Sequence, residues 1–270
     1  MLEFVQSLFN NPVTLFLLVF TMGFIGSAVN AFAGGGAFLT FATLLSAGLP
    51  PIIANATSKI AFIPGSIAAT WAYRHSLRSI KNIILSMLVI ALIGGTIGGL
   101  LTLYIGNDNF QSLIPWLILG ASLLAWRGPD VIERLQKNAH SYVNKSVPIL
   151  GQILLIFTSL YGGFFGAGLG VLLIATLNFR GVTDIHAINA LKNIMSVLIN
   201  LAAVIMYIIW GMVDWHFALI QMSGAILGGY AGGFMGRSLN PNVVRMIILY
   251  VGLILSSIYF YKYGYLEFLF

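Results

Sequence analysis

The chain has 270 residues and a formal net charge of +6, with 59% hydrophobic residues and only 7% charged ones. Ordinary soluble domains carry about 25% charged residues, so this composition excludes a soluble globular domain and predicts a protein of the lipid bilayer. The absence of cysteine excludes disulfides and metal centres built on cysteine. The positive charge says little about the substrate, because membrane proteins concentrate Lys and Arg in cytoplasmic loops.

Apolar segments follow one another along the chain, and most have about 20 residues, the length that crosses a bilayer as a helix. The predicted segments are 12–33, 35–47, 53–73, 82–105, 112–126, 148–165, 167–179, 186–210, 214–235 and 243–262. We expect the first to be a retained helix and not a cleaved signal, because no basic residue precedes it. Segments 35–47 and 167–179 are too short to span easily. The pattern predicts an all-α polytopic membrane protein with short or broken helices at its glycine-rich motifs.

Two stretches from different parts of the chain resemble each other. Residues 48–60 read GLPPIIANATSKI and residues 181–193 read GVTDIHAINALKN, an alignment that pairs Lys59 with Lys192. Glycine clusters lie upstream of both, AFAGGGAFL at 31–39 and GGFFGAGLGVLL at 162–173. This pattern is typical of transporters built from an internal repeat. It predicts a first membrane repeat over 1–126, a basic cytoplasmic linker over 127–147 and a second membrane repeat over 148–270.

The distribution of basic residues predicts the orientation. If the loop with Arg74, Arg78 and Lys81 is cytoplasmic, the other basic residues outside the predicted spans also fall on the inner side, except Lys262. This assignment treats both short segments as crossings and gives each half an odd number of segments, so the two halves are predicted to be inverted. If the short segments are instead re-entrant hairpins, the repeats are parallel.

Lys59 and Lys192 lie within predicted spans, about two turns from the start of their helices. At 1.5 Å per residue, each ammonium group is about 10 Å from its own membrane surface and can reach toward the midplane. The first turns of a helix favour an anion, and glycines allow exposed backbone N–H groups. The pattern predicts a binding site for a small oxyanion. Its candidate residues are Asn55, Thr57, Ser58, Lys59, Asn189, Lys192 and Asn193, with Gly34, Gly35, Gly36, Gly166, Gly168 and Gly170.

Polar residues continue at helical spacing beyond the two lysines. One face carries Asn55, Lys59, Ser66 and Thr70, and another carries Asn189, Lys192, Asn193, Ser196 and Asn200. Other interpretations stay open: a lysine near a helix end often extends to the interface, and asparagines and glycines can simply join helices.

The residue types that are missing also limit the function. No Asp or Glu lies inside a predicted span, which disfavours a carboxylate proton relay and a cation carrier. If protons are coupled to transport, His186 or a lysine is the candidate carrier. The chain has no P-loop and no H-E-x-x-H motif. The protein is therefore predicted not to be an enzyme and to need no cofactor or metal.

Several motifs resemble those of the TauE/SafE sulfite exporter family. The stretch NAFAGGGAFLTFATLLSAGLPPIIANATSKIAFIPGSIAA at 30–69 resembles its first-repeat signature. Its second-repeat signature resembles YGGFFGAGLGVLL at 161–173, IHAINALKN at 185–193 and GMVDWHFALI at 211–220. GAILGGYAGGFMGRSLNPNVVR at 224–245 also fits, so the resemblance covers nearly the whole chain. One departure is Leu169, which stands where the first repeat continues its glycine triplet.

The resemblance implies an integral membrane permease of the bacterial inner membrane, with two related halves and fewer transmembrane helices than the predicted segments. It implies movement of sulfite, sulfoacetate or other sulfur-containing oxyanions and organosulfonates, often outward. Carried onto this sequence, it places the candidate Asn, Thr, Ser and Lys residues near the substrate path.

The functional prediction is a secondary transporter, and specifically an exporter, of small sulfur-containing oxyanions bound between the repeats near the midplane. An alternative is a passive anion channel that uses the same lysines as its selectivity element. A third hypothesis is an assembly subunit whose polar stripes only join helices. The expected partners are a small anionic substrate, the lipid bilayer, a coupling ion (H+ or Na+) and, in a homo-oligomer, further copies of the chain; nucleic acid is not expected.

Overall fold

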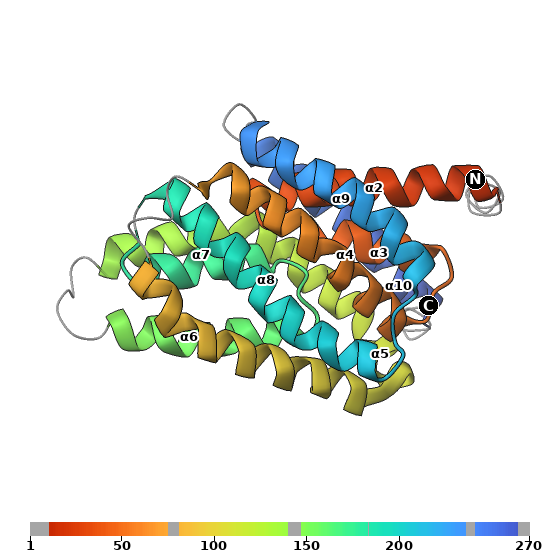
Figure 1. Cartoon of the computed structure of the whole chain (residues 1–270), viewed down its shortest axis with the longest axis horizontal. Helices are drawn as coiled ribbons and strands as arrows, with labels where there is room; N and C mark the ends of the chain where they lie inside the picture. The colour runs from red at the N-terminus through yellow and green to blue at the C-terminus, as the bar shows by residue number, and fades with distance from the viewer. Residues whose placement is uncertain (1–10, 75–80, 140–146, 183, 236–240, 264–270) are drawn as a thin grey trace.

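The computed structural model describes residues 11–74, 81–139, 147–182, 184–235 and 241–263. Helices make up nearly all of this part of the chain, and it contains no β-strand. In chain order (Figure 1) they are α2 (Pro12–Phe32), α3 (Ala37–Ser46), α4 (Pro51–Ala72), α5 (Lys81–Ala139), α6 (Val147–Phe164), α7 (Leu169–Phe179), α8 (Ile185–Ile209), α9 (Trp215–Met235) and α10 (Pro241–Lys262). This result confirms the predicted all-α fold class.

Helix α5 is interrupted at Gly106, whose φ of 76° and ψ of 168° are not helical. Glycine adopts such a backbone because it has no Cβ to clash. The break separates two helices that correspond to the predicted segments 82–105 and 112–126. The second of them continues to Ala139, so helix occupies residues 127–139 of the predicted linker; Lys145 of that linker lies outside the described residues.

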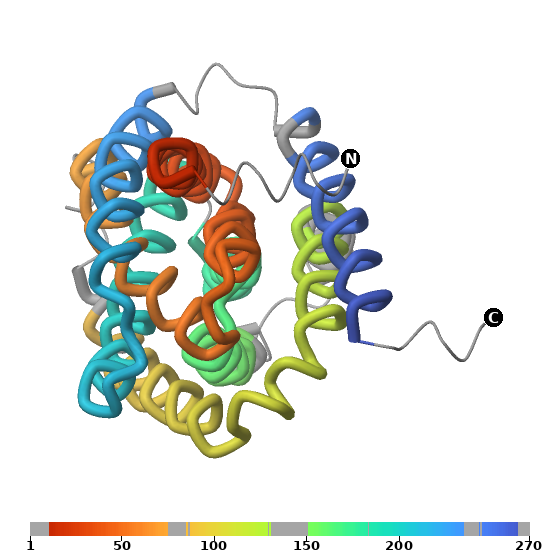
Figure 2. Tube along the Cα trace, turned by 90° about the vertical axis from the view of Figure 1, so that its right-hand side faces the viewer, coloured from red at the N-terminus to blue at the C-terminus, as the bar shows by residue number. Residues whose placement is uncertain are grey.

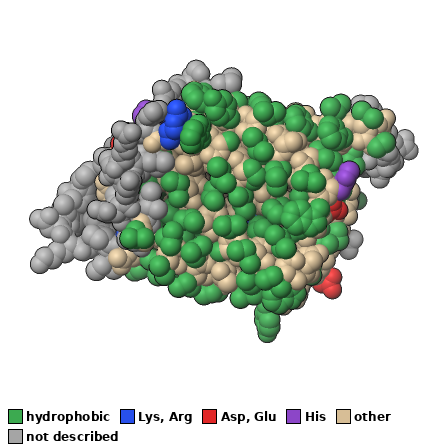
Figure 3. Space-filling model, viewed as in Figure 1, with side chains coloured by type: hydrophobic (Ala, Val, Ile, Leu, Met, Phe, Trp, Pro, Cys, Tyr) green, Lys and Arg blue, Asp and Glu red, His purple; other side chains and the backbone are tan. Residues whose placement is uncertain are grey.

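Several helices are long and apolar enough to cross a membrane, so the protein passes through it several times. In the part of the chain that the structure describes they are Pro12–Phe32, Pro51–Ala72, Met87–Gly128, Ile185–Ile209, Trp215–Phe234 and Arg245–Lys262. The visible surface between the two ends of the molecule is largely hydrophobic (Figure 3). Helices α3 and α7 have only 10 and 11 residues, which confirms short helices at the glycine-rich motifs.

The helices of the two halves pack in matching patterns. Helix α9 packs against both α2 and α4. In the same way, α5 packs against both α6 and α8. Helices α4 and α8 contact each other. In Figure 1, α2 and α4 run from right to left, whereas α6 and α8 run from left to right. This arrangement is compatible with inverted halves.

The short helix α3 lies inside the bundle. Viewed along the long helices (Figure 2), it is enclosed by them, and most of its side chains are buried. Helix α7 is likewise mostly buried. Each short helix follows a glycine-containing break, so the protein places two irregular segments of backbone in its interior, where lipid does not reach them.

The two ends of the bundle can be told apart by their contacts. At one end, here named the inner end, the end of α4 meets the start of α8, and the rings of Tyr73 and His186 lie 6.3 Å apart between centroids. At the opposite end, named the outer end, the start of α4 meets the break in α5, where Ile52 N donates a hydrogen bond to Asn107 Oδ1.

Charge is distributed unequally between these ends. Figure 3 shows a small blue basic group at one end of the visible face, with a histidine side chain beside it, and acidic and histidine side chains at the other end. The arginines that the helix directions place at the inner end are Arg74, Arg127, Arg180 and Arg245; Arg78 and Arg237 lie outside the described residues. By the positive-inside rule this end faces the cytoplasm.

Candidate functional site

Lys59 is buried in α4, and its ammonium group binds the last turn of α6. The Nζ atom donates hydrogen bonds to the carbonyl oxygens of Gly162 and Gly163, the second at 2.9 Å. The last four carbonyl groups of a helix have no partner within the helix, and a cation is favourable at this negative end. Lys59 is only 4% exposed, so it does not extend to the membrane surface.

Lys192 is buried in α8 and makes the corresponding contact with α2. Its Nζ atom donates to the carbonyl oxygens of Asn30 and Ala31, both at 2.8 Å, and to Asn189 Oδ1 at 3.1 Å. An ammonium group has three N–H donors, so every donor of Lys192 is used. The residue is completely buried.

The two lysines therefore make equivalent contacts in the two halves. Each helix that precedes a glycine break ends inside the protein, and each end receives a lysine from the other half. Both breaks contain a glycine with a φ of 82°, Gly34 in the first and Gly166 in the second. In a bilayer, unsatisfied carbonyl groups are costly, and the reciprocal lysines satisfy them while joining the two halves.

A small cavity lies beside Lys59, between elements of both halves. Its polar lining consists of Asn30, Asn55, Ser58, Lys59, Ser196 and Asn200. The remaining lining is Ala37, Phe41, Phe62, Phe165, Gly166, Ala167 and Leu169. The centre of a water molecule can occupy about 20 Å³ of it. The lining contains one cationic side chain, several neutral hydrogen-bonding groups and no carboxylate.

Residues 19–260 match the family described as Sulfite exporter TauE/SafE. The chain belongs to this family. It is a membrane transporter family, which agrees with the multi-pass helical fold and with a place in the inner membrane.

Similar proteins in three bacteria support the assignment to the TauE/SafE family. A "Probable membrane transporter protein" of Haemophilus influenzae is 26% identical over 95% of this chain and 98% of its own length. A "Probable membrane transporter protein ORF9" of Sinorhizobium is 27% identical over 90% of this chain and 91% of its own. "Probable membrane transporter protein YfcA" of Escherichia coli is 26% identical over 95% and 93%. No solved structure matches the chain significantly.

In this TauE/SafE member, the cavity brings together only some of the predicted site residues. Asn55, Ser58, Lys59 and Gly166 line it. Asn55 Nδ2 donates to the carbonyl oxygen of Phe164 at 2.9 Å, and the amide has a second N–H with which it can donate to another partner. The Ser58 hydroxyl lies 3.1 Å from that of Thr40.

The other predicted side chains lie elsewhere. Thr57 Oγ1 accepts a hydrogen bond from Asp214 N at 3.0 Å and connects α4 to the start of α9. Asn189 binds Lys192, and neither lines the cavity. Asn193 is completely buried outside the cavity lining, and neither polar atom of its side chain has a hydrogen-bond partner in the described part of the chain.

Most of the predicted glycines other than Gly166 allow close packing, and Gly168 allows a left-handed backbone. A Cβ atom on Gly34 would lie 2.5 Å from the carbonyl carbon of Gly170, so the two breaks cross in contact. A Cβ atom on Gly36 would clash with the backbone of Gly26. Gly35 packs near Ile248, and Gly168 begins α7 with a left-handed φ of 77°.

Asn30 is the polar residue of the cavity lining that the sequence motifs did not single out. It is an amide in the last turn of an apolar span, four residues before the first glycine of the triplet, and that position is the signal that could have identified it. The backbone carbonyl of Asn30 accepts a hydrogen bond from Lys192, and Asn30 also lines the cavity. Ser196 and Asn200 belong to the predicted α8 stripe, and the structure adds both to the site.

Proposed function

We propose that this protein is a secondary transporter that exports small sulfur-containing oxyanions such as sulfite, sulfoacetate or related organosulfonates. The observation that carries the proposal is the cavity lining, which combines the Lys59 ammonium group with neutral amides and hydroxyls and has no carboxylate. Such a lining attracts a small anion and offers donors for its oxygens. The match to the Sulfite exporter TauE/SafE family supports the choice of anion.

The two lysines have different roles in this mechanism. Lys59 has two carbonyl partners, so one N–H remains to bind an oxyanion in the cavity. Lys192 has no donor left; it acts as a positioning residue that holds the end of α2 and with it Asn30. The amides of Asn55 and Asn200 and the hydroxyl of Ser196 then orient the anion.

The cavity volume indicates a closed conformation. A cavity needs about 10–15 Å³ for water centres to hold one water molecule, so about 20 Å³ does not hold an anion with several oxygens. Binding and release therefore require the site to open toward one side of the membrane at a time, as in alternating access. A closed site of this size favours a carrier over the channel alternative.

The test is transport by the purified protein in liposomes. Wild-type protein is expected to accumulate radiolabelled sulfite against its gradient when an H+ or Na+ gradient is imposed, whereas a channel only equilibrates it. Lys59→Met is expected to abolish the flux, and Lys59→Arg to retain part of it. Arg127→Gln is the control, because this exposed arginine lies over the Trp126 ring at 4.4 Å and is not part of the cavity lining.

Anion identity is tested by thermal shifts in detergent with sulfite, sulfate, thiosulfate, sulfoacetate and taurine. Stabilisation by the sulfur oxyanions in wild-type protein, and its loss in Lys59→Met, is the expected result. Wild-type flux in Lys59→Met would reject the site, and absence of flux and of any shift in wild-type protein would reject the function.

A further inference from the structure

One face of α8 is polar from the cavity to the inner end of the bundle. Its members follow at spacings of three and four residues, which places them on one helix face. They are His186, Asn189, Asn193, Ser196 and Asn200. From first to last they cover fourteen residue steps, about 21 Å of helix at 1.5 Å per residue. This α8 stripe reaches the cavity through Ser196 and Asn200.

Several polar atoms of the α8 stripe are buried and have no hydrogen-bond partner among the residues that the structure describes. They are His186 Nδ1, both side-chain atoms of Asn193 and the Ser196 hydroxyl. Asn193 is 0% exposed and Ser196 only 2%. Buried polar groups nearly always bind a protein group or ordered water. Their concentration on one helix face therefore indicates that water or a polar solute binds along this face.

The matching face of α4 has no such character. The internal alignment that pairs Lys59 with Lys192 also pairs each member of the α8 stripe with a residue of α4. Those residues are Ile53, Ala56, Ile60, Ile63 and Ile67, all apolar. The polar stripe is thus a property of α8 and not a necessary consequence of the repeated fold.

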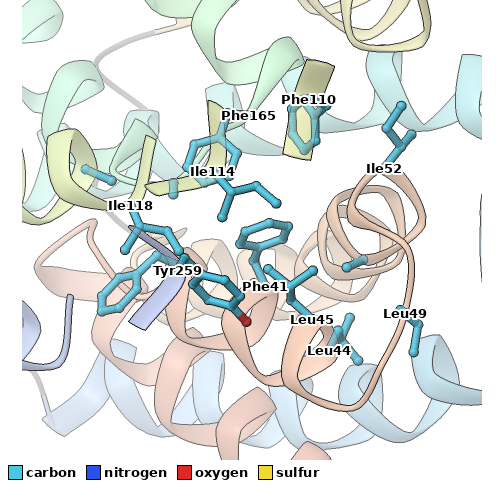
Figure 4. Close-up of a cluster of buried hydrophobic side chains, with 14 of the residues drawn as sticks. Phe41, Leu44, Leu45, Leu49, Ile52, Phe110, Ile114, Ile118, Phe165 and Tyr259 are labelled. Atoms are coloured by element: carbon cyan, nitrogen blue, oxygen red, sulfur yellow. The ribbon is translucent and has the colours of Figure 1, made fainter. Parts of the chain in front are cut away.

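The outer side of the cavity is also apolar. Phe41 and Phe165 line the cavity and pack edge to face with centroids 5.2 Å apart. Phe165 in turn lies 6.3 Å from Phe110, four residues beyond the break at the outer end. Figure 4 shows these rings within one cluster that also contains Ile114 and Leu45. The three phenylalanine rings offer water no hydrogen-bonding group.

We propose that the α8 stripe forms the inner half of the transport path, a hydrated track along which the anion passes between the cavity and the cytoplasm. This inference rests on the proposed function, because the track leads to the proposed anion site. Tyr73 and His186, whose rings meet where α4 ends and α8 begins, form its inner closure. The aromatic cluster of Phe41, Phe110 and Phe165 is the closure on the other side.

The absence of native cysteine permits a direct test with single cysteines in the full-length protein. Asn193→Cys and Ser196→Cys are treated in liposomes with a charged, membrane-impermeant methanethiosulfonate applied from the inner side. The matched controls are Ile60→Cys and Ile63→Cys, at the paired positions of α4. We expect both α8 cysteines to react at least tenfold faster than the α4 cysteines, and to react slowly from the outer side.

A second variant tests the inner closure. Adding Tyr73→Ala to Asn193→Cys is expected to raise the labelling rate from the inner side severalfold, and Tyr73→Phe to raise it less. Only variants that elute as a single folded species in detergent are compared. Equal labelling of the α4 and α8 cysteines, or protection of both α8 positions from the inner side, would overturn the proposal.

The labelling experiment needs no transported anion, so its failure is distinguishable from failure of the proposed function. Inert α8 cysteines in a protein that still transports sulfite would reject the track and leave the cavity intact. Rapid labelling in a protein that transports no anion would keep the hydrated track and reject the transporter.

Discussion

Helices α4 and α8 occupy matching places in the two halves, and each holds a buried lysine against the end of a helix in the other half. Their remaining residues differ. Helix α4 contains Pro64, which lacks an N–H and leaves the carbonyl of Ile60 without its helical partner. Helix α8 has no internal proline and carries the polar stripe. The lysines make equivalent contacts in both halves, whereas the side chains around them differ between the halves.

The largest effect is expected where the two breaks cross. Gly34→Ala adds a Cβ 2.5 Å from the backbone of Gly170, and neither backbone can move freely, so we expect no folded protein in detergent. Gly166→Ala places its Cβ 3.0 Å from the Gly162 oxygen and 3.2 Å from Lys59 Nζ. It should fold and lose anion binding, because the ammonium group is displaced.

Gly48→Ala is the control for these glycines. Its φ is 94°, but no atom lies within 4 Å of the added Cβ, so the cost is backbone strain of about 1–2 kcal/mol. Size-exclusion profiles and thermal unfolding in detergent measure all three variants. A stable Gly34→Ala protein would show that the crossing is looser than its geometry indicates.

The next largest effect separates the two lysines. Lys59→Met removes one hydrogen bond from a charged group to the anion, worth about 1.5–3 kcal/mol, so the affinity for sulfite should fall about 10- to 100-fold. Both Lys59→Met and Lys192→Met should lower the unfolding temperature, because each leaves two helix-end carbonyl groups without a partner. Lys192→Met should leave the affinity for sulfite nearly unchanged. Binding isotherms and thermal unfolding of both variants check this. Equal losses of affinity would mean that both lysines contact the anion.

A smaller effect is expected from the neutral cavity residues. Asn30→Ala and Asn200→Ala each remove a neutral donor, about 1 kcal/mol, and should weaken anion binding about fivefold. Ser66→Ala is the control, since Ser66 belongs to the predicted α4 stripe and is buried but is not part of the cavity lining. Titration measures the anion affinity of each variant. If Ser66→Ala binds the anion as weakly as the asparagine variants, the site extends along α4 instead.

The smallest effect concerns how the two helices begin. Asp184 is the N-cap residue of α8, and its side chain accepts hydrogen bonds from His186 N and Ala187 N. Helix α4 starts at a proline, and its cap is Asn107 of α5. Asp184→Ala and Asn107→Ala should each reduce the free energy of unfolding by about 1 kcal/mol. Because the caps lie at opposite ends, the double variant should show the sum. A clearly non-additive result from thermal unfolding would indicate coupling between the ends.

Most of the helices could be predicted from hydrophobic segment length and glycine position along the chain. The predicted segments lie close to the helices of the structure, including the short helices α3 and α7 at 35–47 and 167–179. Hydrophobic length and glycine position are local properties, so they can be read without knowing any tertiary contact. The helical residues 127–139 were assigned to a linker because charge suggested a loop, although charged residues also form helices beyond the membrane.

The site was only partly predictable for a different reason. Asn55, Ser58 and Lys59 come from one helical stretch, and that stretch was identified by its unusual polarity. Asn30 and Gly166 reach the same cavity from the two breaks, far apart in the chain. Thr57 shares the polarity of its neighbours but turns toward α9, and nothing in its local sequence distinguishes it from Ser58.

The amino-acid sequence by itself determined the membrane class, the helical segments, the internal similarity and the presence of two lysines in apolar surroundings. Those properties depend on composition and on spacing along one helix. Only the tertiary structure decided that each lysine binds a helix end of the other half, and that Lys59 alone of the two lines the cavity. The reason is physical: a buried ammonium group takes whichever carbonyl groups the packing leaves unsatisfied, and packing brings together residues more than a hundred positions apart.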